Sequence, residues 1–129
     1  MRLKDKVILI TASTRGIGLA ITKACAEEGA IVYMGARNLE RAGQRADELN
    51  QKGFRVKYVY NDAYEPETYD SMVEEVVKNE GRIDVLVNNF GTSDPKKDMD
   101  ISHTDCKDFL HIVNTNLTSV FAASPAALK

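Results

Sequence analysis

The sequence is poor in several residue types that would place it in a special class of protein. It has no tryptophan, only three prolines and two cysteines, and no apolar run near the roughly 20 residues of a membrane span. Cys25 and Cys106 are far apart and form no CxxC pair, so we expect reduced thiols in a cytosolic protein. The charged N-terminus lacks the apolar core of a signal peptide. We therefore expect a cytoplasmic protein with no membrane partner.

An excess of positive charge is also missing. The 17 Lys and Arg residues against 19 Asp and Glu residues give a net charge of −2, so a nucleic-acid partner is not expected. His103 and His111 have no cysteine or carboxylate at ligand spacing, and no metal site is predicted. With 43% hydrophobic and 28% charged residues, the composition is that of one globular domain over residues 1–129.

Short apolar, β-branched runs alternate with stretches of helical periodicity. The runs predict strands at residues 6–11, 31–34, 56–60 and 83–88, separated by helices that end near Glu28, Leu49 and Gly81. A last helix is expected from about Thr104. Strands that alternate with helices predict an α/β, Rossmann-like, doubly wound parallel sheet of order 3-2-1-4. The first helix is expected to carry its apolar stripe at Ile17, Ala20, Ile21, Ala24 and Cys25.

The segment from Thr11 to Gly18 joins the first strand to the first helix. This is where an α/β sheet binds an anion, because free N–H groups and the helix dipole favour negative charge there. Gly16 and Gly18 allow close approach of a phosphate, and Ser13 and Thr14 offer hydroxyl groups. A glycine pair also fits an ordinary tight turn, but its place after the first strand favours a nucleotide site.

This segment resembles the Thr-Gly-x-x-x-Gly-x-Gly fingerprint of the short-chain dehydrogenase/reductase family. Thr11, Gly16 and Gly18 match, whereas Ala12 replaces the first glycine. Alanine is disfavoured if the backbone there needs a positive φ angle, so we expect altered turn geometry rather than lost binding.

Two further segments carry the same resemblance. Asn88-Asn89-Phe90-Gly91 is similar to the family's Asn-Asn-Ala-Gly, which supports the central sheet and lies against the cofactor. Asn116 matches the family's active-site asparagine, which helps to hold a water in the proton relay. From the residues and the resemblance together, the candidate cofactor-binding residues are Thr11, Ser13, Thr14, Arg15, Gly16, Ile17, Gly18, Arg37, Asn38, Asp62, Ala63, Asn89, Phe90 and Gly91.

The end of the second strand predicts which nicotinamide cofactor is preferred. Members of this fold that bind NAD place a carboxylate there, but Ala36 holds this position and Arg37 follows it. Arg37 and Arg15 favour NADP, since a guanidinium binds a 2′-phosphate with two parallel hydrogen bonds. Alternatively, Arg37 is a solvated surface charge and Arg15 only packs over the adenine. Asn38 either adds a polar contact or caps the next helix.

Asp62 and Ala63 follow the third predicted strand. Asp62 resembles the family aspartate that accepts a hydrogen bond from the adenine amino group. The alternative is an aspartate that only forms the turn after the strand.

The family's remaining catalytic residues are not found in this sequence. The proton partner for hydride transfer in the family is the tyrosine of a Tyr-x-x-x-Lys pair, and no tyrosine here is followed by lysine at that spacing. Of the family's four catalytic positions, only Asn116 is present. We therefore expect a truncated, N-terminal half that is inactive alone. Its open sheet edge and apolar last helix predict that it is marginally stable or oligomeric.

Within the family, the sequence resembles bacterial, clostridial-type 7α-hydroxysteroid dehydrogenases. It is carried by residues 1–7, 33–41, 58–63 and 81–91. Those enzymes oxidise the 7α-hydroxyl group of bile acids with NADP, so the resemblance implies a small steroid or bile-acid substrate and a homo-oligomeric full-length enzyme. An inactive nucleotide-binding fragment and an NADP-linked carbonyl reductase with another substrate remain alternatives.

Overall fold

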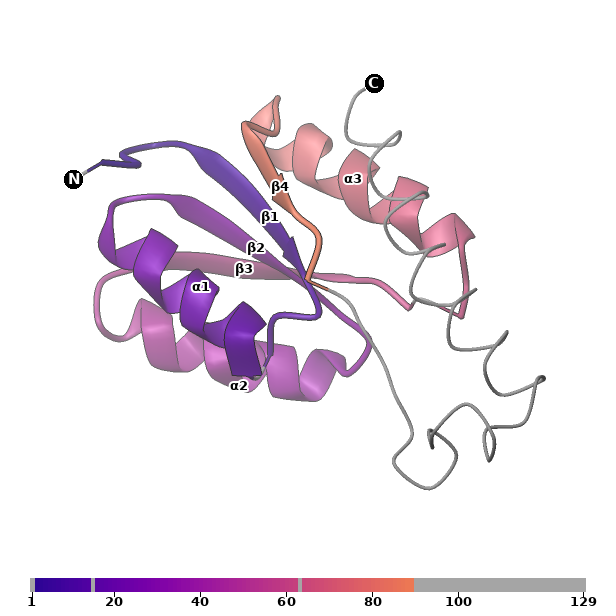
Figure 1. Cartoon of the computed structure of the whole chain (residues 1–129), viewed down its shortest axis with the longest axis horizontal. Helices are drawn as coiled ribbons and strands as arrows, with labels where there is room; N and C mark the ends of the chain where they lie inside the picture. Colours follow the sequence, from indigo (N-terminus) through magenta and orange to yellow (C-terminus); the bar gives the residue numbers. More distant parts are fainter. Residues whose placement is uncertain (1, 15, 63, 90–129) are drawn as a thin grey trace, which may run out of the picture.

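The computed structural model describes residues 2–14, 16–62 and 64–89, which form a parallel sheet between two layers of helices (Figure 1). The strands lie in the order β3-β2-β1-β4, which confirms the predicted topology and α/β class. The elements follow one another along the chain as β1 (Val7–Thr11), α1 (Gly16–Glu27), β2 (Ile31–Ala36), α2 (Leu39–Asn50), β3 (Arg55–Tyr60), α3 (Glu67–Glu80) and β4 (Val85–Val87). The second strand is longer than predicted and the fourth is shorter.

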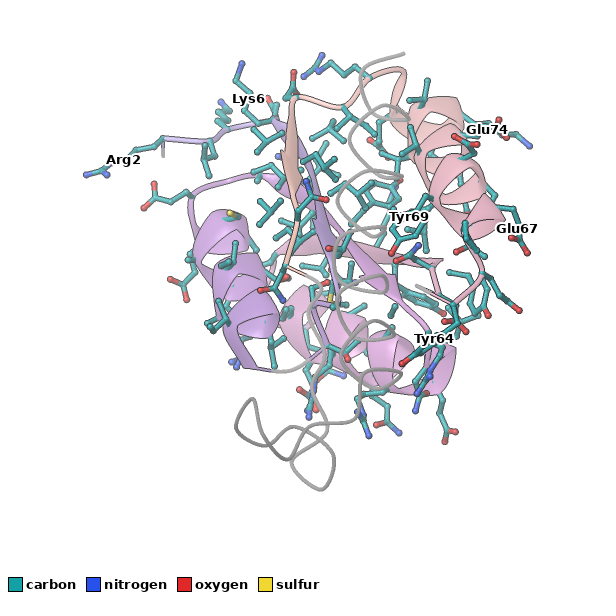
Figure 2. All side chains as sticks on the ribbon, turned by 45° about the vertical axis from the view of Figure 1, so that its right-hand side comes forward. Arg2, Lys6, Tyr64, Glu67, Tyr69 and Glu74 are labelled. Atoms are coloured by element: carbon teal, nitrogen blue, oxygen red, sulfur yellow. The ribbon has the colours of Figure 1, made fainter. Side chains whose placement is uncertain are left out.

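Each face of the sheet has its own hydrophobic core. Helices α1 and α2 cover one face, where Ile8 and Ile10 of β1 pack with Leu49 of α2. Helix α3 covers the other face, and Figure 2 shows the Tyr69 side chain between α3 and the sheet, while Glu67 points away from it. All five residues of β1 are buried, as expected of a strand that is covered on both faces. Within the described part of the chain, no helix has the length and apolar character needed to cross a bilayer.

The predicted apolar stripe of α1 is confirmed in part: Ile21 and Cys25 are partly buried and pack against the core, whereas Ala20 and Ala24 are exposed. Ile17 is 73% exposed, and the buried positions of α1 are Gly18, Thr22 and Ala26. Gly18 is buried because the start of α1 lies against the loop after β1: a Cβ added to Gly18 would lie 2.6 Å from the Ala12 carbonyl oxygen. The buried Thr22 hydroxyl donates to the Gly18 carbonyl oxygen at 2.9 Å, so burying it leaves no polar group unpaired.

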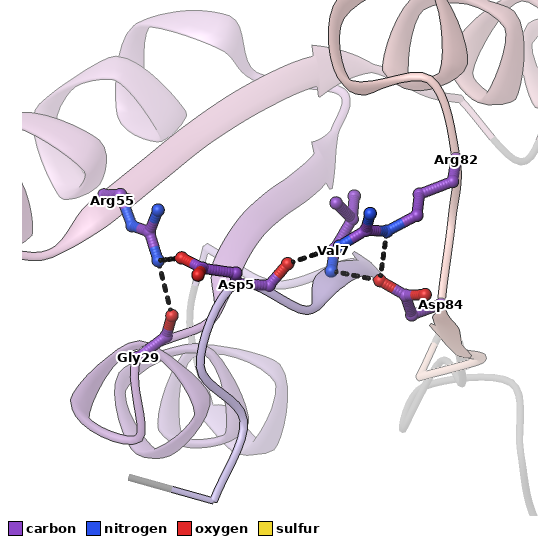
Figure 3. Close-up of polar contacts among 6 residues, drawn as sticks. All are labelled: Asp5, Val7, Gly29, Arg55, Arg82 and Asp84. Atoms are coloured by element: carbon purple, nitrogen blue, oxygen red, sulfur yellow. Dashed lines mark hydrogen bonds and ion pairs between the residues drawn. The ribbon is translucent and has the colours of Figure 1, made fainter.

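A network of charged side chains joins the amino ends of the strands (Figure 3). The Asp84 carboxylate accepts hydrogen bonds from the Val7 N–H at 2.8 Å and from the Arg82 Nε–H at 3.0 Å. Arg55 donates to the Asp5 carboxylate and to the Gly29 carbonyl oxygen, both at 2.7 Å. The Val7 N–H is the main cause of the lowered pKa of Asp84, and Arg82 adds to it. These contacts fix β4 and β3 relative to β1 at the edge of the sheet opposite the loop between β1 and α1.

Candidate functional site

The candidate site lies at the carboxyl edge of the sheet. Because the strands are parallel, the segments that follow them all emerge at this edge, with Thr11 beside Gly35 and Ala36 beside Tyr60. The strand order reverses between β1 and β4, and a ligand binds at such a switch point in open α/β sheets. The topology therefore gathers the loop after β1 with residues 36–38, 60–62 and 88–89.

Asn89 connects the loop after β1 to the end of β4. Its backbone N–H donates to Thr11 Oγ1 at 2.9 Å, and its side-chain Nδ2–H donates to the Ala12 carbonyl oxygen at 3.0 Å. The Thr11 hydroxyl lies 3.4 Å from the Val87 carbonyl oxygen. Thr11 and Asn89, predicted from different motifs, are thus in direct contact, and they hold the loop against the sheet.

The backbone of this loop passes twice through the left-handed region. Ala12 has a φ angle of +50° and Gly16 one of +59°. Ala12 therefore adopts the kind of conformation that a glycine takes without steric cost. Gly18 is required for space: an added Cβ would lie 2.6 Å from the Ala12 carbonyl oxygen and from Asn89 Nδ2, and 2.7 Å from Ser13 Cα. Because Gly18 has no side chain, the start of α1 can pack directly against the loop.

The two hydroxyl residues of the loop have different surroundings. The Ser13 side chain is fully buried and donates to the Ile10 carbonyl oxygen at 2.9 Å, so a phosphate contact would require it to give up this bond. Thr14 is half-buried, and its carbonyl oxygen accepts from Arg45 Nε at 3.3 Å. Arg45 also lies 3.4 Å from Glu48. Sequence reasoning missed Arg45, because nothing in the periodicity of α2 singles out one of its charged residues.

Arg37 and Asn38 follow β2 at the carboxyl edge. The Asn38 side chain accepts a hydrogen bond from the Arg41 N–H at 3.0 Å. Asn38 therefore caps α2, which is one of its two predicted roles. Arg37 is exposed, and Ala36 before it is 4% exposed and provides no carboxylate. The pKa of Tyr60 is raised mainly by its hydrogen bond to Glu65, and the nearby Arg37 charge opposes this shift.

Asp62 lies in a turn that joins β3 to α3. Its Oδ1 accepts a hydrogen bond from the Tyr64 N–H at 2.9 Å, which is the turn that the sequence offered as one alternative. Its backbone N–H donates to Thr68 Oγ1, also at 2.9 Å. The other carboxylate oxygen has no hydrogen-bond partner among residues 2–14, 16–62 and 64–89. The turn therefore leaves one oxygen of Asp62 for a ligand.

Several predicted site residues lie outside the described part of the chain. These are Arg15, Ala63, Phe90, Gly91 and Asn116. The other predicted cofactor residues surround the carboxyl edge. Ile17 is among them, and its exposed side chain is on the first turn of α1.

Comparison with known proteins gives a consistent result. A family model described as short chain dehydrogenase matches residues 6–129. The 7alpha-hydroxysteroid dehydrogenase of Paraclostridium sordellii is 46% identical over 123 residues, which are 95% of this chain and 46% of that protein. The protein of the same name from Clostridium sardiniense is 44% identical over 127 residues, which are 98% of this chain and 48% of that protein.

Solved structures show the same similarity. A short chain dehydrogenase from Mycobacterium smegmatis has a TM-score of 0.89 and 34% identity, over 98% of this chain and 52% of that one. A gluconate 5-dehydrogenase from Burkholderia cenocepacia, in complex with NADP and tartrate, has a TM-score of 0.88 and 31% identity, over 98% and 49%. The chain therefore spans about half the length of the proteins that it matches.

Proposed function

The chain belongs to the short-chain dehydrogenase/reductase family, and from that premise we propose that it forms the NADP-binding part of an oxidoreductase. The loop between β1 and α1 would bind the pyrophosphate of the dinucleotide at the helix N-terminus. The positive φ angles at Ala12 and Gly16 and the close packing at Gly18 support this assignment, because they place the loop directly against the start of α1.

The preference for NADP rests on one observation, the exposed Arg37 after a strand that ends in alanine. A carboxylate at Ala36 would bind a ribose 2′-hydroxyl and repel a 2′-phosphate, but this position is apolar and 4% exposed. The adjacent guanidinium can donate to phosphate oxygens. Asn38 Oδ1 caps α2, and its amide N–H groups are left as donors, so we assign the specificity for the 2′-phosphate to Arg37 and Arg15, with Asn38 as an additional polar contact.

Asp62 is proposed to bind the adenine. The turn after β3 holds one of its carboxylate oxygens with the Tyr64 N–H, and the second oxygen is left for the amino group of the base. Turn formation and adenine binding are therefore compatible roles for the same side chain.

The proposed substrate is the 7α-hydroxyl group of a bile acid or related steroid. The two similar proteins named for this activity cover nearly all of the present chain and support the proposal. When bound, the nicotinamide would exchange a hydride with the carbinol carbon. Asn116 would help to hold a water for the accompanying proton transfer, while the serine, tyrosine and lysine of the family mechanism are not found in these 129 residues. Nucleotide binding without turnover is the alternative for the chain alone.

The cofactor proposal is tested by replacing Arg37 with alanine and titrating the protein with NADPH and NADH. Arg37→Ala should weaken NADPH binding about 10- to 100-fold, because hydrogen bonds to a charged group contribute this much to affinity. The affinity for NADH should change by less than about twofold. Arg41→Ala is the matched control, since it removes another exposed arginine nearby. Equal losses for both nucleotides in Arg37→Ala would contradict the 2′-phosphate role.

The substrate proposal is tested by NADP-linked oxidation of a 7α-hydroxy bile acid by the protein purified from its native source, with the 7β epimer as control. Turnover of the 7α epimer supports the hydroxysteroid assignment. Nucleotide binding with no turnover of either epimer supports the binding-only alternative for this chain.

A further inference from the structure

Thr68, in the first turn of α3, is at the centre of a compact set of hydrogen bonds below the carboxyl edge of the sheet. The residue is 6% exposed. Its Oγ1 accepts from the Asp62 N–H at 2.9 Å and from the Asn61 Nδ2–H at 3.2 Å. The same oxygen lies 2.8 Å from the Glu65 carbonyl oxygen and 3.1 Å from that of Asp62.

These contacts use the whole capacity of one hydroxyl group. A threonine hydroxyl has one proton to donate and two lone pairs to accept with. The two N–H groups fill the lone pairs, and the proton goes to one carbonyl at a time, of which Glu65 is the nearer. A buried polar group that is fully satisfied specifies one arrangement of its neighbours, because any shift would leave a buried partner unpaired.

The arrangement that Thr68 specifies is that of Asp62. On one side of Asp62, the Asn61 N–H donates to the Ala36 carbonyl oxygen at 2.9 Å, which ties the chain to the end of β2. On the other side, the Glu65 N–H donates to the Asp62 carbonyl oxygen, also at 2.9 Å. Thr68 holds the Asp62 N–H between these two anchors, so the direction of the carboxylate depends on a residue six positions further along the chain.

We propose that Thr68 is a positioning residue for base recognition: its buried hydroxyl holds the Asp62 turn so that the carboxylate accepts from the amino group of an adenine. The inference rests on the proposed function, because it assumes that the carboxyl edge binds a dinucleotide. It assigns the selectivity for the base to a pair of residues, of which only Asp62 would touch the ligand.

A purely structural role for Thr68 would give a different result. The N-cap position of α3 is Pro66, which makes no side-chain cap hydrogen bond, so the Thr68 hydroxyl could serve only to begin the helix. In that case its removal would destabilise α3 and weaken every nucleotide equally. Positioning of Asp62 instead predicts a loss that depends on the amino group of the base.

The experiment measures the affinity of the protein for NADPH and for its deamino analogue, in which hypoxanthine carries an oxygen in place of the amino group. Thr68→Val keeps the shape of the side chain and removes the hydroxyl. We expect it to weaken NADPH binding about tenfold, as for loss of one hydrogen bond to a charged group, and to change deamino-NADPH less than twofold. Thr68→Ser should restore the selectivity, and Asp62→Asn should abolish it.

Ser71→Ala is the matched control, because the Ser71 hydroxyl donates to the Thr68 carbonyl oxygen in the same helix and does not contact Asp62. It should leave both affinities unchanged. If Thr68→Val does not fold, Thr68→Cys gives the same test with a smaller loss, since a thiol is a weak hydrogen-bonding group.

Equal losses for the two nucleotides in Thr68→Val, or no loss for NADPH, would overturn the positioning role while the dinucleotide site stands. Failure of the unsubstituted protein to bind either nucleotide would overturn the proposed function and this inference together.

Discussion

Ala12 is the residue of the phosphate-loop candidate at which the backbone and the side chain are in conflict. Its φ angle is +50°, and in the left-handed region the Cβ of an L-residue approaches the following carbonyl oxygen. This costs roughly 1–2 kcal/mol. Ala12→Gly removes the Cβ and the conflict. It also gives the unfolded chain more freedom, which offsets about 0.4–1 kcal/mol of the gain. We therefore expect Ala12→Gly to raise the free energy of unfolding by about 0.5–1 kcal/mol.

The assay is urea denaturation followed by circular dichroism, with a thermal melt as a second measurement. For a domain of this size a gain of about 1 kcal/mol corresponds to a rise in Tm of roughly 3–6 °C. Binding of NADPH should stay within about twofold, because the Ala12 group that contacts Asn89 is the backbone carbonyl oxygen, which glycine keeps. Gly53→Ala is the matched control in the opposite direction. Gly53 has a φ angle of +89° with nothing within 4 Å of an added Cβ, so only strain should lower its stability.

An unchanged or lowered urea midpoint for Ala12→Gly would refute the strain argument, provided that Gly53→Ala lowers the midpoint in the same experiment. It would mean that the Ala12 methyl group makes contacts that compensate for its conformation. A large loss of NADPH affinity would show instead that the alanine is needed to stiffen the loop.

Two other substitutions test the packing and the electrostatics. Gly18→Ala should lower the free energy of unfolding by about 1–3 kcal/mol and weaken nucleotide binding, because the new Cβ would overlap backbone atoms that cannot rotate away. A urea midpoint and a nucleotide affinity like those of the unsubstituted protein would refute this. The pKa of Glu80 is lowered from its ordinary value of 4.5, first by the Tyr33 hydroxyl and also by Lys57. Glu80 thus contributes stability that is present above pH 4.5 and is lost as the pH falls through the lowered value. Glu80→Gln should flatten the acid side of a plot of urea midpoint against pH, and an unchanged plot would contradict this.

The topology was predictable because its signals are local and strong. The run Val7–Thr11 has no polar side chain before its last residue, and the structure buries every one of its residues between two helical layers. Gly29, Gly53 and Gly81 mark the ends of three helical segments, and all three have positive φ angles. Right-handed crossovers then leave few ways to order the strands.

The buried face of α1 was only partly predictable from hydrophobic periodicity. That method assumes that the largest apolar residues are the most buried, but the fully buried positions of α1 are Gly18, Thr22 and Ala26, and Ile21 and Cys25 are only partly buried against the core. Ile17 is left exposed beside the loop. The exposed Ile17 side chain is available to contact a ligand. The position at which the periodicity prediction is wrong therefore lies at the candidate site.

The roles of the polar residues at the carboxyl edge depend on pairings that a sequence does not encode locally. Asn89 contacts Thr11 across 78 positions, and its amide acts on a backbone carbonyl that carries no sequence signal. The two alternatives for Asp62, turn residue and adenine ligand, both use the carboxylate. In the structure, the turn uses only one carboxylate oxygen of Asp62, which accepts from the Tyr64 N–H, and the Asp62 backbone N–H, which donates to Thr68 Oγ1. An aspartate that is held through one carboxylate oxygen and its backbone N–H is better suited to select a base than a free one, since less conformational entropy remains to be lost on binding.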